Sequence, residues 1–363
     1  MSGLYIHLPF CKSKCGYCGF YSEPDAYGLT EKYFDALLKD LSARQSAEYD
    51  TFYIGGGTPS SVSPVLLSAF LEKLSAKIPF SFEESTIEAN PESVTPDFLS
   101  VVREFGFSRI SMGCQSTDEK VLKLLGRVHG RAEIFGAAEL IRKMCPDTAL
   151  NLDMIFDIPS VDNSVQMKTL EEMISLAPEH VSAYSYSFDT EYLKNTEPCG
   201  DSAFLDVKKA LQAAGYHKYE ISNFAKAGHE SRHNMAYWRL KDYDGLGASA
   251  WSLKNFEGGR VLSGKTGDLH EYIANPEAFA ETDKTEGIHA AAQELVFGLR
   301  MLDGTDFSLL KYRYGDAACV FEERVGTLVS EGMLTWRREN LCLTEKGELI
   351  LDSVQEYLWG CLP

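Results

Sequence analysis

The sequence lacks any apolar run long enough to cross a membrane, and its first residues lack the charged-then-apolar pattern of a secretory signal. Its nine cysteines do not form the spaced pairs of a disulfide framework. Internal repeats and low-complexity tracts are absent as well. From these absences we expect a protein of the reducing cytoplasm without a membrane span, while peripheral association with a membrane stays open.

Positive charge is also scarce. The 363 residues include 35 Lys and Arg against 53 Asp and Glu, which gives a formal net charge of −18. A surface that binds the phosphates of nucleic acid needs the opposite balance, so we expect no nucleic-acid partner.

The length of the chain suits a barrel-sized domain together with a smaller domain, at about 150 residues per domain.

What the sequence does contain is a regular alternation of short apolar or β-branched runs with longer amphipathic stretches, up to about residue 190. This alternation is typical of repeated βα units around a parallel sheet. Cap residues and prolines predict helix starts at Thr30, Ser63-Pro64 and Thr95-Pro96. Six runs are expected to be strands: Leu4–Leu8, Thr51–Ile54, Thr86–Ala89, Arg109–Met112, Leu150–Ile155 and Val181–Tyr186.

Polar or glycine-rich residues follow or end five of these strands. They are the cysteine-containing segment after Leu8, then Gly55-Gly56-Gly57-Thr58-Pro59, Glu88-Ala89-Asn90-Pro91, Gly113-Cys114-Gln115-Ser116, and Asn151 with Asp153. In barrels, functional groups gather at the carboxyl ends of the strands. The fold class we predict is therefore α/β, with a partial (β/α) barrel of six units favoured over a doubly wound sheet.

Three cysteines, Cys11, Cys15 and Cys18, lie within eight residues directly after the first predicted strand. Cysteine thiolates are the usual ligands of a four-iron cluster, and three of them leave one iron open for another ligand. A zinc knuckle would need a fourth Cys or His, and no second CxxC follows. A structural metal-binding module stays as an alternative. His7, just before the cysteines, is either a hydrogen-bond donor behind the site or a packing residue.

The CxxxCxxC spacing, with Tyr17 before the last cysteine, resembles the signature of the radical S-adenosylmethionine (SAM) superfamily. Within it, the segment from Tyr5 to Phe20 resembles the HemN/HemW branch. The resemblance implies a [4Fe-4S] cluster on the three cysteines, SAM at the open iron and an electron donor that reduces the cluster. It further implies a partial barrel of six units and the ability to cleave SAM.

The same resemblance assigns cofactor-binding residues. The glycine loop by itself could equally be a tight strand-to-helix turn or a ligand-binding loop, and a buried Glu88 by itself could be half of an ion pair; both match SAM-binding motifs of the family. In oxidase relatives the positions of Gln115, Arg127 and Asp153 line a second SAM site, so the number of SAM molecules stays open. The expected SAM-binding residues are Tyr5, Tyr17, Gly56, Gly57, Thr58, Glu88, Gln115, Arg127 and Asp153.

A second motif, residues 232–238, is followed by a glycine-rich stretch at 242–250 that we expect to be a turn. Residue types alone favour a packed, hydrogen-bonded histidine there. The order His233-Asn234-x-x-Tyr237-Trp238 nevertheless matches the HNxxYW motif of HemW-type haem chaperones, which implies that His233, Tyr237 and Trp238 bind haem. Phe20 agrees, because the related oxidases place another cysteine at that position.

We expect three segments: a barrel at 1–190, an extension with HNxxYW at 191–285, and a winged-helix-like C-terminal domain at 286–363. In the last segment the pattern predicts a helix that begins with Leu295, Phe297, Leu299 and Leu302. It also predicts helices from Phe321 and from Thr344, and a hairpin that pairs Met333–Trp336 with Leu341–Leu343.

The family resemblance implies a haem chaperone that delivers haem to an acceptor protein, and no catalytic residue is assigned. An oxygen-independent coproporphyrinogen III oxidase of porphyrin biosynthesis and a structural metal module are the alternatives.

Overall fold

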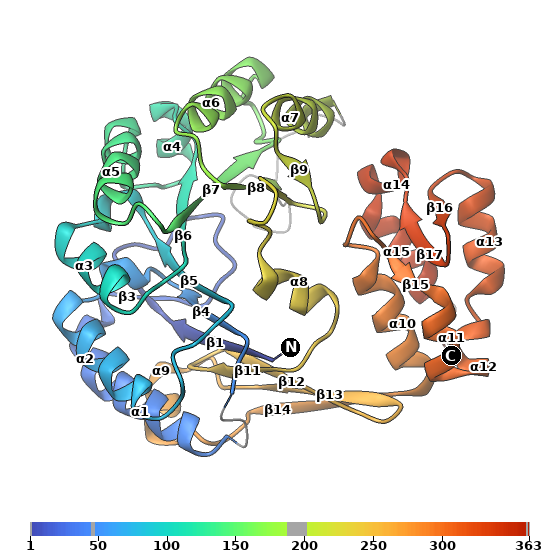
Figure 1. Ribbon diagram of the computed structural model, residues 1–363, viewed down its shortest axis with the longest axis horizontal. Coiled ribbons are helices and arrows are strands. Elements are labelled where there is room, and N and C mark those ends of the chain that lie inside the picture. Colours follow the sequence, from blue (N-terminus) through green and yellow to red (C-terminus); the bar gives the residue numbers. More distant parts are fainter. Residues whose placement is uncertain (1, 45–47, 187–201, 361, 363) are drawn as a thin grey trace.

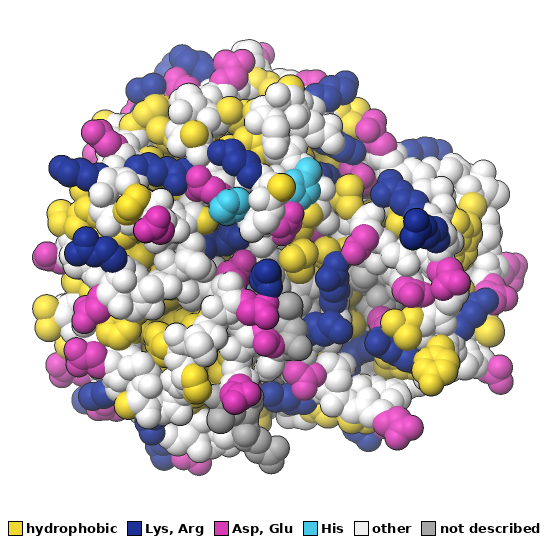
Figure 2. Space-filling view, in the orientation of Figure 1, with side chains coloured by type: hydrophobic (Ala, Val, Ile, Leu, Met, Phe, Trp, Pro, Cys, Tyr) yellow, Lys and Arg dark blue, Asp and Glu magenta, His cyan; other side chains and the backbone are white. Residues whose placement is uncertain are grey.

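The structure is a computed structural model, which describes residues 2–44, 48–186, 202–360 and 362. The domain boundary expected at residue 190 lies outside the described residues. No helix in these ranges combines the length and the apolar character that a bilayer-spanning segment requires. Figure 2 shows Asp and Glu side chains interspersed with Lys and Arg over one face of the molecule.

Parallel strands form the centre of the molecule, with helices around them (Figure 1). Each of the six strands predicted from the sequence is present, and the observed ends lie within three residues of the predicted ones. The partial barrel is thus confirmed. Neighbouring strands follow the chain order: β1 (Gly3–Leu8), β4 (Thr51–Gly56), β5 (Glu84–Ala89), β6 (Arg109–Gln115), β7 (Ala149–Phe156) and β8 (His180–Ser185).

Strand residues alternate between two environments. Leu4, Ile6 and Leu8 of β1 are fully buried in the large hydrophobic core, whereas Tyr5 and His7 line the interior cavity. Successive side chains of a strand point to opposite faces, so each strand packs apolar residues against the outer helices and turns the other residues inward. The barrel interior therefore holds the polar and aromatic side chains.

Helices cover the outside of the barrel. At the start of α3, Thr95 Oγ1 accepts a hydrogen bond from Phe98 N, and α2 begins with Pro64. The cap predicted for Thr30 is wrong, because Thr30 is already helical and its hydroxyl donates to Tyr27 O. The helices are α1 (Thr30–Ser42), α2 (Pro64–Ser75), α3 (Pro96–Glu104), α4 (Glu119–Leu124), α5 (Arg131–Met144), α6 (Asn163–Ser175) and α7 (Ser202–Ala213).

The sheet continues beyond β1 and beyond β8. The glycine-rich stretch expected to be a turn contains β11, a strand parallel to β1, and this prediction is therefore wrong in part. Short helices α8 (Arg232–Trp238) and α9 (Leu269–Ala274) lie in the same region. The added strands are β9 (His217–Lys218), β10 (Asn223–Ala225), β11 (Tyr243–Leu246), β12 (Trp251–Phe256), β13 (Gly259–Gly264) and β14 (Glu281–Glu286).

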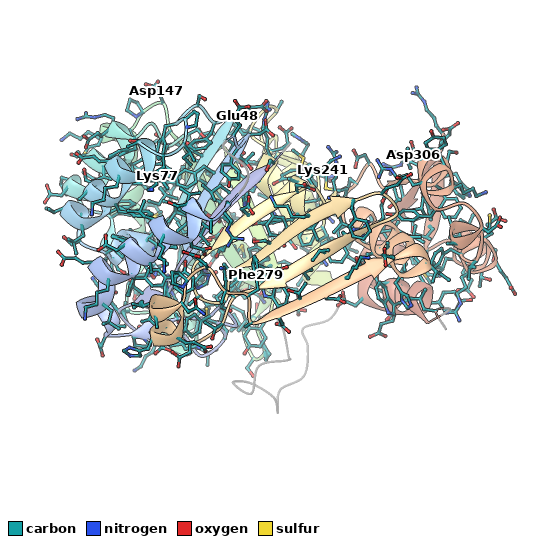
Figure 3. All side chains as sticks on the ribbon, turned by 90° about the horizontal axis from the view of Figure 1, so that it is seen from below. Glu48, Lys77, Asp147, Lys241, Phe279 and Asp306 are labelled. Carbon is teal, nitrogen blue, oxygen red and sulfur yellow. The ribbon has the colours of Figure 1, made fainter. Side chains whose placement is uncertain are left out.

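The C-terminal domain has its own hydrophobic core, and β11–β14 reach toward it along one side of the molecule (Figure 3). The predicted hairpin is confirmed as β16 paired with β17. The helix expected from Leu295 is α10, which begins earlier and ends at Gly298, so Leu299 and Leu302 lie outside it. The elements are α10 (Gly287–Gly298), β15 (Thr305–Asp306), α11 (Phe307–Tyr314), α12 (Asp316–Cys319), α13 (Glu322–Ser330), β16 (Leu334–Arg337), β17 (Asn340–Leu343), α14 (Glu345–Leu349) and α15 (Leu351–Trp359).

A buried charge network joins α1 to the residues after β13. Asp40 accepts hydrogen bonds from Lys265 Nζ at 3.0 Å, Tyr272 OH at 3.0 Å and Arg44 Nη2 at 2.7 Å. The Lys265 side chain is 0% exposed. A buried charge is tolerated only when it is paired, so this network holds the β11–β14 extension against the barrel.

Replacement of Lys265 by methionine should lower the free energy of unfolding by about 3 kcal/mol, because it leaves the buried Asp40 with one fewer cation. Urea unfolding followed by circular dichroism measures this loss. The matched control is Lys73→Met, which breaks an exposed ion pair with Asp35 and should change stability by less than about 0.5 kcal/mol. Equal effects of the two variants would contradict a structural role for the network.

Candidate functional site

The cysteine loop follows β1 at the carboxyl end of the barrel strands. Cys11 ends the short strand β2 (Phe10–Cys11), which pairs with β3 (Glu23–Pro24), and Cys18 N donates to Cys15 O. All three cysteines are free thiols of intermediate exposure. The Cys11 Sγ lies 3.5 Å from Thr58 Oγ1, and the Cys15 Sγ lies 3.6 Å from Arg127 Nη1.

The surroundings of these thiols fit a cluster with several irons. Burial raises the pKa of Cys11, and the Thr58 hydrogen bond and the Arg127 guanidinium counteract that rise. Among the described residues, no three His, Cys, Asp or Glu side chains converge as they would around a single ion. In a four-iron cluster each thiolate binds a different iron, so its sulfurs need not meet at one point.

The glycine loop fastens the cysteine strand. Gly57 N donates to Leu8 O at 2.8 Å, and Thr58 N donates to Phe10 O at 2.7 Å. A Cβ at Gly57 would lie 2.6 Å from Leu8 O, so no other residue fits without a shift of backbone. The backbone amides of Gly57 and Thr58 are therefore used in hydrogen bonds to the protein backbone. Of the loop glycines, only Gly56 lines the cavity.

Glu88 lies beside this loop, on the inner face of β5. Its Oε1 accepts from Tyr53 OH at 2.7 Å and its Oε2 from Gly56 N at 3.0 Å. Burial raises its pKa to about 7, and the neighbouring Asp153 adds to the rise. Among the described residues no Lys or Arg forms an ion pair with Glu88, so the alternative of a structural ion pair is not what the geometry shows.

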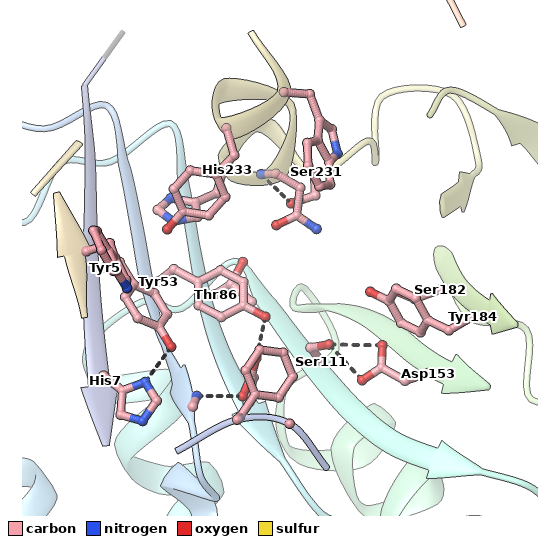
Figure 4. Close-up of a pocket in the computed structure, with 18 of the residues that line it drawn as sticks. Tyr5, His7, Tyr53, Thr86, Ser111, Asp153, Ser182, Tyr184, Ser231 and His233 are labelled. Carbon is pink, nitrogen blue, oxygen red and sulfur yellow. Dashed lines mark hydrogen bonds between the residues drawn. The ribbon is translucent and has the colours of Figure 1, made fainter. Parts of the chain in front are cut away.

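Gln115 and Asp153 reach the cavity from β6 and β7. A bulge at the end of β6, with Gln115 at φ 67°, turns the Gln115 side chain toward the cavity. Asp153 Oδ1 accepts from Asn151 Nδ2 at 2.7 Å, and Ser111 Oγ lies 3.3 Å from Oδ2 (Figure 4). Burial raises the pKa of Asp153.

Arg127 lies behind this group rather than on the cavity wall. Its Nη2 donates to Asn90 Oδ1 at 2.6 Å and to Gly113 O at 2.8 Å. Its Nη1 approaches Tyr17 OH at 3.4 Å as well as the Cys15 Sγ. Arg127 thus connects the ends of β5 and β6 to the cysteine loop, and it places a positive charge beside the sulfur of Cys15.

His7 supports the loop from the other side. The His7 Nδ1 lies 2.9 Å from Tyr5 OH, and its Nε2 lies 2.9 Å from Tyr21 O. Burial lowers the pKa of His7 to about 4, so the ring is neutral near pH 7. Of the two roles expected for His7, the contacts show hydrogen bonding to the segment after Cys18.

The second motif forms α8, whose residues His233, Tyr237 and Trp238 line the cavity; Figure 4 shows His233 at its edge, next to Ser231. His233 is 1% exposed, and its ring stacks on Tyr53 with the centroids 5.1 Å apart. Its Nδ1 lies 2.9 Å from Thr51 Oγ1 and its Nε2 lies 2.8 Å from Tyr237 OH. Burial lowers the pKa of His233 to about 3, so the ring is neutral near pH 7. Both nitrogens of this neutral ring have hydrogen-bond partners.

One cavity of about 840 Å³ joins the cysteine end to α8. It contains Tyr5, Tyr17, Gly56, Glu88, Gln115 and Asp153 from one set of predicted residues and His233, Tyr237 and Trp238 from the other. Gly57, Thr58 and Arg127 do not line it, and neither do Cys11, Cys15 and Cys18, although their neighbours Tyr17 and Gly19 do. Phe297 of α10 brings the C-terminal domain to the wall. The aromatic residues of the wall are Tyr5, Tyr17, Phe20, Tyr21, Tyr53, Tyr184, Tyr186, Tyr237, Trp238, Tyr243, Trp251 and Phe297.

The sequence interpretation missed several cavity residues, among them Tyr53, Thr86, Arg109 and His180. Of these, Thr86 stands two positions before the recognised Glu88 on β5 and so shares its strand face. Counting back by two from Glu88 would have found Thr86, whereas no recognised residue gives Tyr53, Arg109 or His180 by an unbroken count along its strand. Nothing comparable marks Trp251 or Phe297, which belong to the extension and the C-terminal domain.

Comparison with known proteins supplies the family. The model of the radical SAM superfamily matches residues 5–173, and that of the HemN C-terminal domain matches residues 287–350. Heme chaperone HemW of Escherichia coli is 32% identical, with 97% of each chain covered. Heme chaperone HemW of Mycobacterium tuberculosis is 30% identical, covering 99% of this chain and 95% of the relative, and that of Bacillus subtilis is 28% identical over 98% of each.

A solved structure has the same fold. Coproporphyrinogen III oxidase (HemN) from Escherichia coli, a radical SAM enzyme, aligns with a TM-score of 0.82 and 20% identity, covering 98% of this chain and 89% of that one. The radical SAM match implies a [4Fe-4S] cluster and SAM, in agreement with the free cysteines and the adjoining cavity. The chain belongs to the HemW family of the radical SAM superfamily.

Proposed function

We propose that this protein is a haem carrier, which binds haem in the half of the cavity next to α8 and passes it to an acceptor protein. The observation that carries the proposal is that His233, Tyr237 and Trp238 line the same cavity as the residues of the cysteine end. The relatives named heme chaperone HemW, which match nearly the whole chain, support it. An electron donor for the cluster is the second partner implied.

The cavity has the size and surface that a flat apolar ligand needs. Its volume of about 840 Å³ falls within the usual range for ligand pockets, about 300 to 1,000 Å³. Tyrosine and tryptophan rings offer flat faces for stacking and exclude water. A neutral His233 can give a nitrogen lone pair to a metal once the Tyr237 hydroxyl moves away from Nε2.

At the other end, Cys11, Cys15 and Cys18 would hold the cluster, and Gly56, Glu88, Gln115 and Asp153 face the space where SAM would lie. The [4Fe-4S] cluster supplies single electrons, which in the radical SAM superfamily serve to cleave SAM. Tyr5 and Tyr17 wall that space, while Gly57, Thr58 and Arg127 keep the cysteine loop in place. An ionised Glu88 suits the hydroxyl groups of a ribose.

Replacement of Cys11, Cys15 or Cys18 by alanine should abolish the cluster, since each cysteine would bind a separate iron. Anaerobic reconstitution followed by iron analysis and absorbance at about 400 nm measures the loss. The matched control is Cys319→Ala, because Cys319 is an exposed cysteine of the C-terminal domain and its removal should leave the cluster unchanged. A full cluster in any of the three loop variants would contradict the assignment.

Haem titration of the reconstituted protein tests the carrier function. We expect saturable binding in a 1:1 ratio, and His233→Ala should remove the spectral bands of an axial histidine while His270→Ala, an exposed histidine on α9, keeps them. Unchanged spectra in His233→Ala would remove the proposed ligand. Product analysis with coproporphyrinogen under reducing anaerobic conditions is the parallel test, and formation of protoporphyrinogen would favour an oxidase over a carrier.

The pH dependence of SAM binding should follow Glu88. Because its pKa is raised to about 7, Glu88 is ionised above that pH and protonated below it, and only the carboxylate accepts two hydroxyl hydrogen bonds well. Calorimetric titration should show SAM affinity falling by about tenfold from pH 8 to pH 6. Glu88→Gln should bind SAM more weakly at pH 8 and show a flat profile; a profile in that variant with the same slope would exclude Glu88.

A further inference from the structure

Two polar side chains of the cavity lack the partners that buried groups normally have. Thr86 on β5 and Arg109 on β6 stand opposite each other in register, and both line the cavity. Thr86 is 0% exposed and Arg109 is 5% exposed. Among the residues that the structure describes, Thr86 Oγ1, Arg109 Nε and Arg109 Nη1 have no hydrogen-bond partner. Buried donors of this kind are normally paired.

The guanidinium of Arg109 is anchored through one nitrogen only. Its Nη2 donates to His229 O at 2.7 Å and approaches Glu84 Oε2 at 3.3 Å. An arginine carries five N–H groups, one on Nε and two on each Nη. Three of them, on Nε and Nη1, therefore remain without a partner in the described part of the chain. The contacts of Nη2 anchor the side chain, while the N–H groups on Nε and Nη1 are buried and no described residue satisfies them.

Glu84 neutralises the charge of Arg109 only in part, because most of the hydrogen bonds that Glu84 accepts come from the start of α8. It accepts from Ser231 Oγ at 3.3 Å, from Arg232 N at 2.9 Å and from His233 N at 3.0 Å. The Glu84 carboxylate thus holds the first turn of α8, and the same contact places His233 near Arg109.

The charged side chains of the cavity are distributed unevenly, with the positive one and the carboxylates at different ends. Arg109 is the one Lys or Arg among the described residues that line it. The carboxylates of Glu88 and Asp153 lie farther along β5 and β7, toward the cysteine loop. A negatively charged group on a ligand would be repelled at that end and attracted at Arg109.

We propose that Arg109 and Thr86 form a carboxylate-binding subsite, which takes a propionate group of haem held beside α8. The inference rests on the proposed function and adds to it the orientation of the ligand. A propionate there accepts charge-assisted hydrogen bonds from Arg109 Nε or Nη1 and a hydrogen bond from the Thr86 hydroxyl. The ring system then extends along the aromatic wall toward His233.

The test compares haem with its dimethyl ester, in which both propionates are blocked. The reconstituted full-length protein should bind haem about tenfold more tightly than the ester, as expected for loss of a charged hydrogen bond. Thr86→Val keeps the side-chain shape and should reduce this preference several-fold. Arg109→Lys keeps a cation for Glu84 but loses the guanidinium donors, and should abolish the preference. Affinity for the ester should stay unchanged in both variants.

Ser185→Ala is the matched control, because the Ser185 hydroxyl lines the same cavity but already bonds to Asp157 Oδ2 at 3.1 Å. It should keep the wild-type preference for haem. Equal affinity of the wild-type protein for haem and its ester would overturn the subsite and leave the carrier function standing. Equal weakening of both ligands by Thr86→Val would also overturn it. Failure of the wild type to bind either ligand would remove the carrier function, and the subsite with it.

Discussion

The two-faced pleat of the parallel strands is the constraint on which the rest of the molecule depends. Each strand packs one row of apolar residues against the outer helices, as Ile87 and Ile110 do, and is then obliged to turn its other row inward. Because the partial barrel is too wide for these inner side chains to fill, a cavity remains. The polar and aromatic residues of that cavity are thus placed by the packing of residues that never touch it.

The cysteine loop is held by backbone rather than by side chains. Hydrogen bonds from Gly57 N and Thr58 N to the carbonyls of Leu8 and Phe10 join the ends of β1 and β4. A glycine is required at position 57 because the neighbouring carbonyls leave no room for a Cβ. Arg127 fastens the other side of the loop, through contacts with Cys15 and Tyr17. A loop fixed in this way holds the three cysteines in a defined arrangement.

How much could be predicted from the sequence depended on the range of the interactions. The six strands and the cysteine loop come from local pattern, and the structure has the strands within three residues of their expected places. The sequence predicts a turn in place of strand β11, because this short glycine-containing stretch becomes a strand only by pairing with β1, about 240 residues earlier. Likewise, nothing local reveals that His233 meets Thr51, 182 residues away, or that Arg109 has donors left over.

The engaged state of His233 has a consequence for any cargo. With Thr51 at Nδ1 and Tyr237 at Nε2, the ring already has its own occupants inside the protein, and an arriving metal has to displace one of them. Because the metal has to replace an existing hydrogen bond of His233, the net free energy gained when haem binds is smaller. The same arrangement also offers a ready replacement on unloading, since the phenol can return to the nitrogen as the metal departs. A protein built this way is suited to exchange rather than to storage.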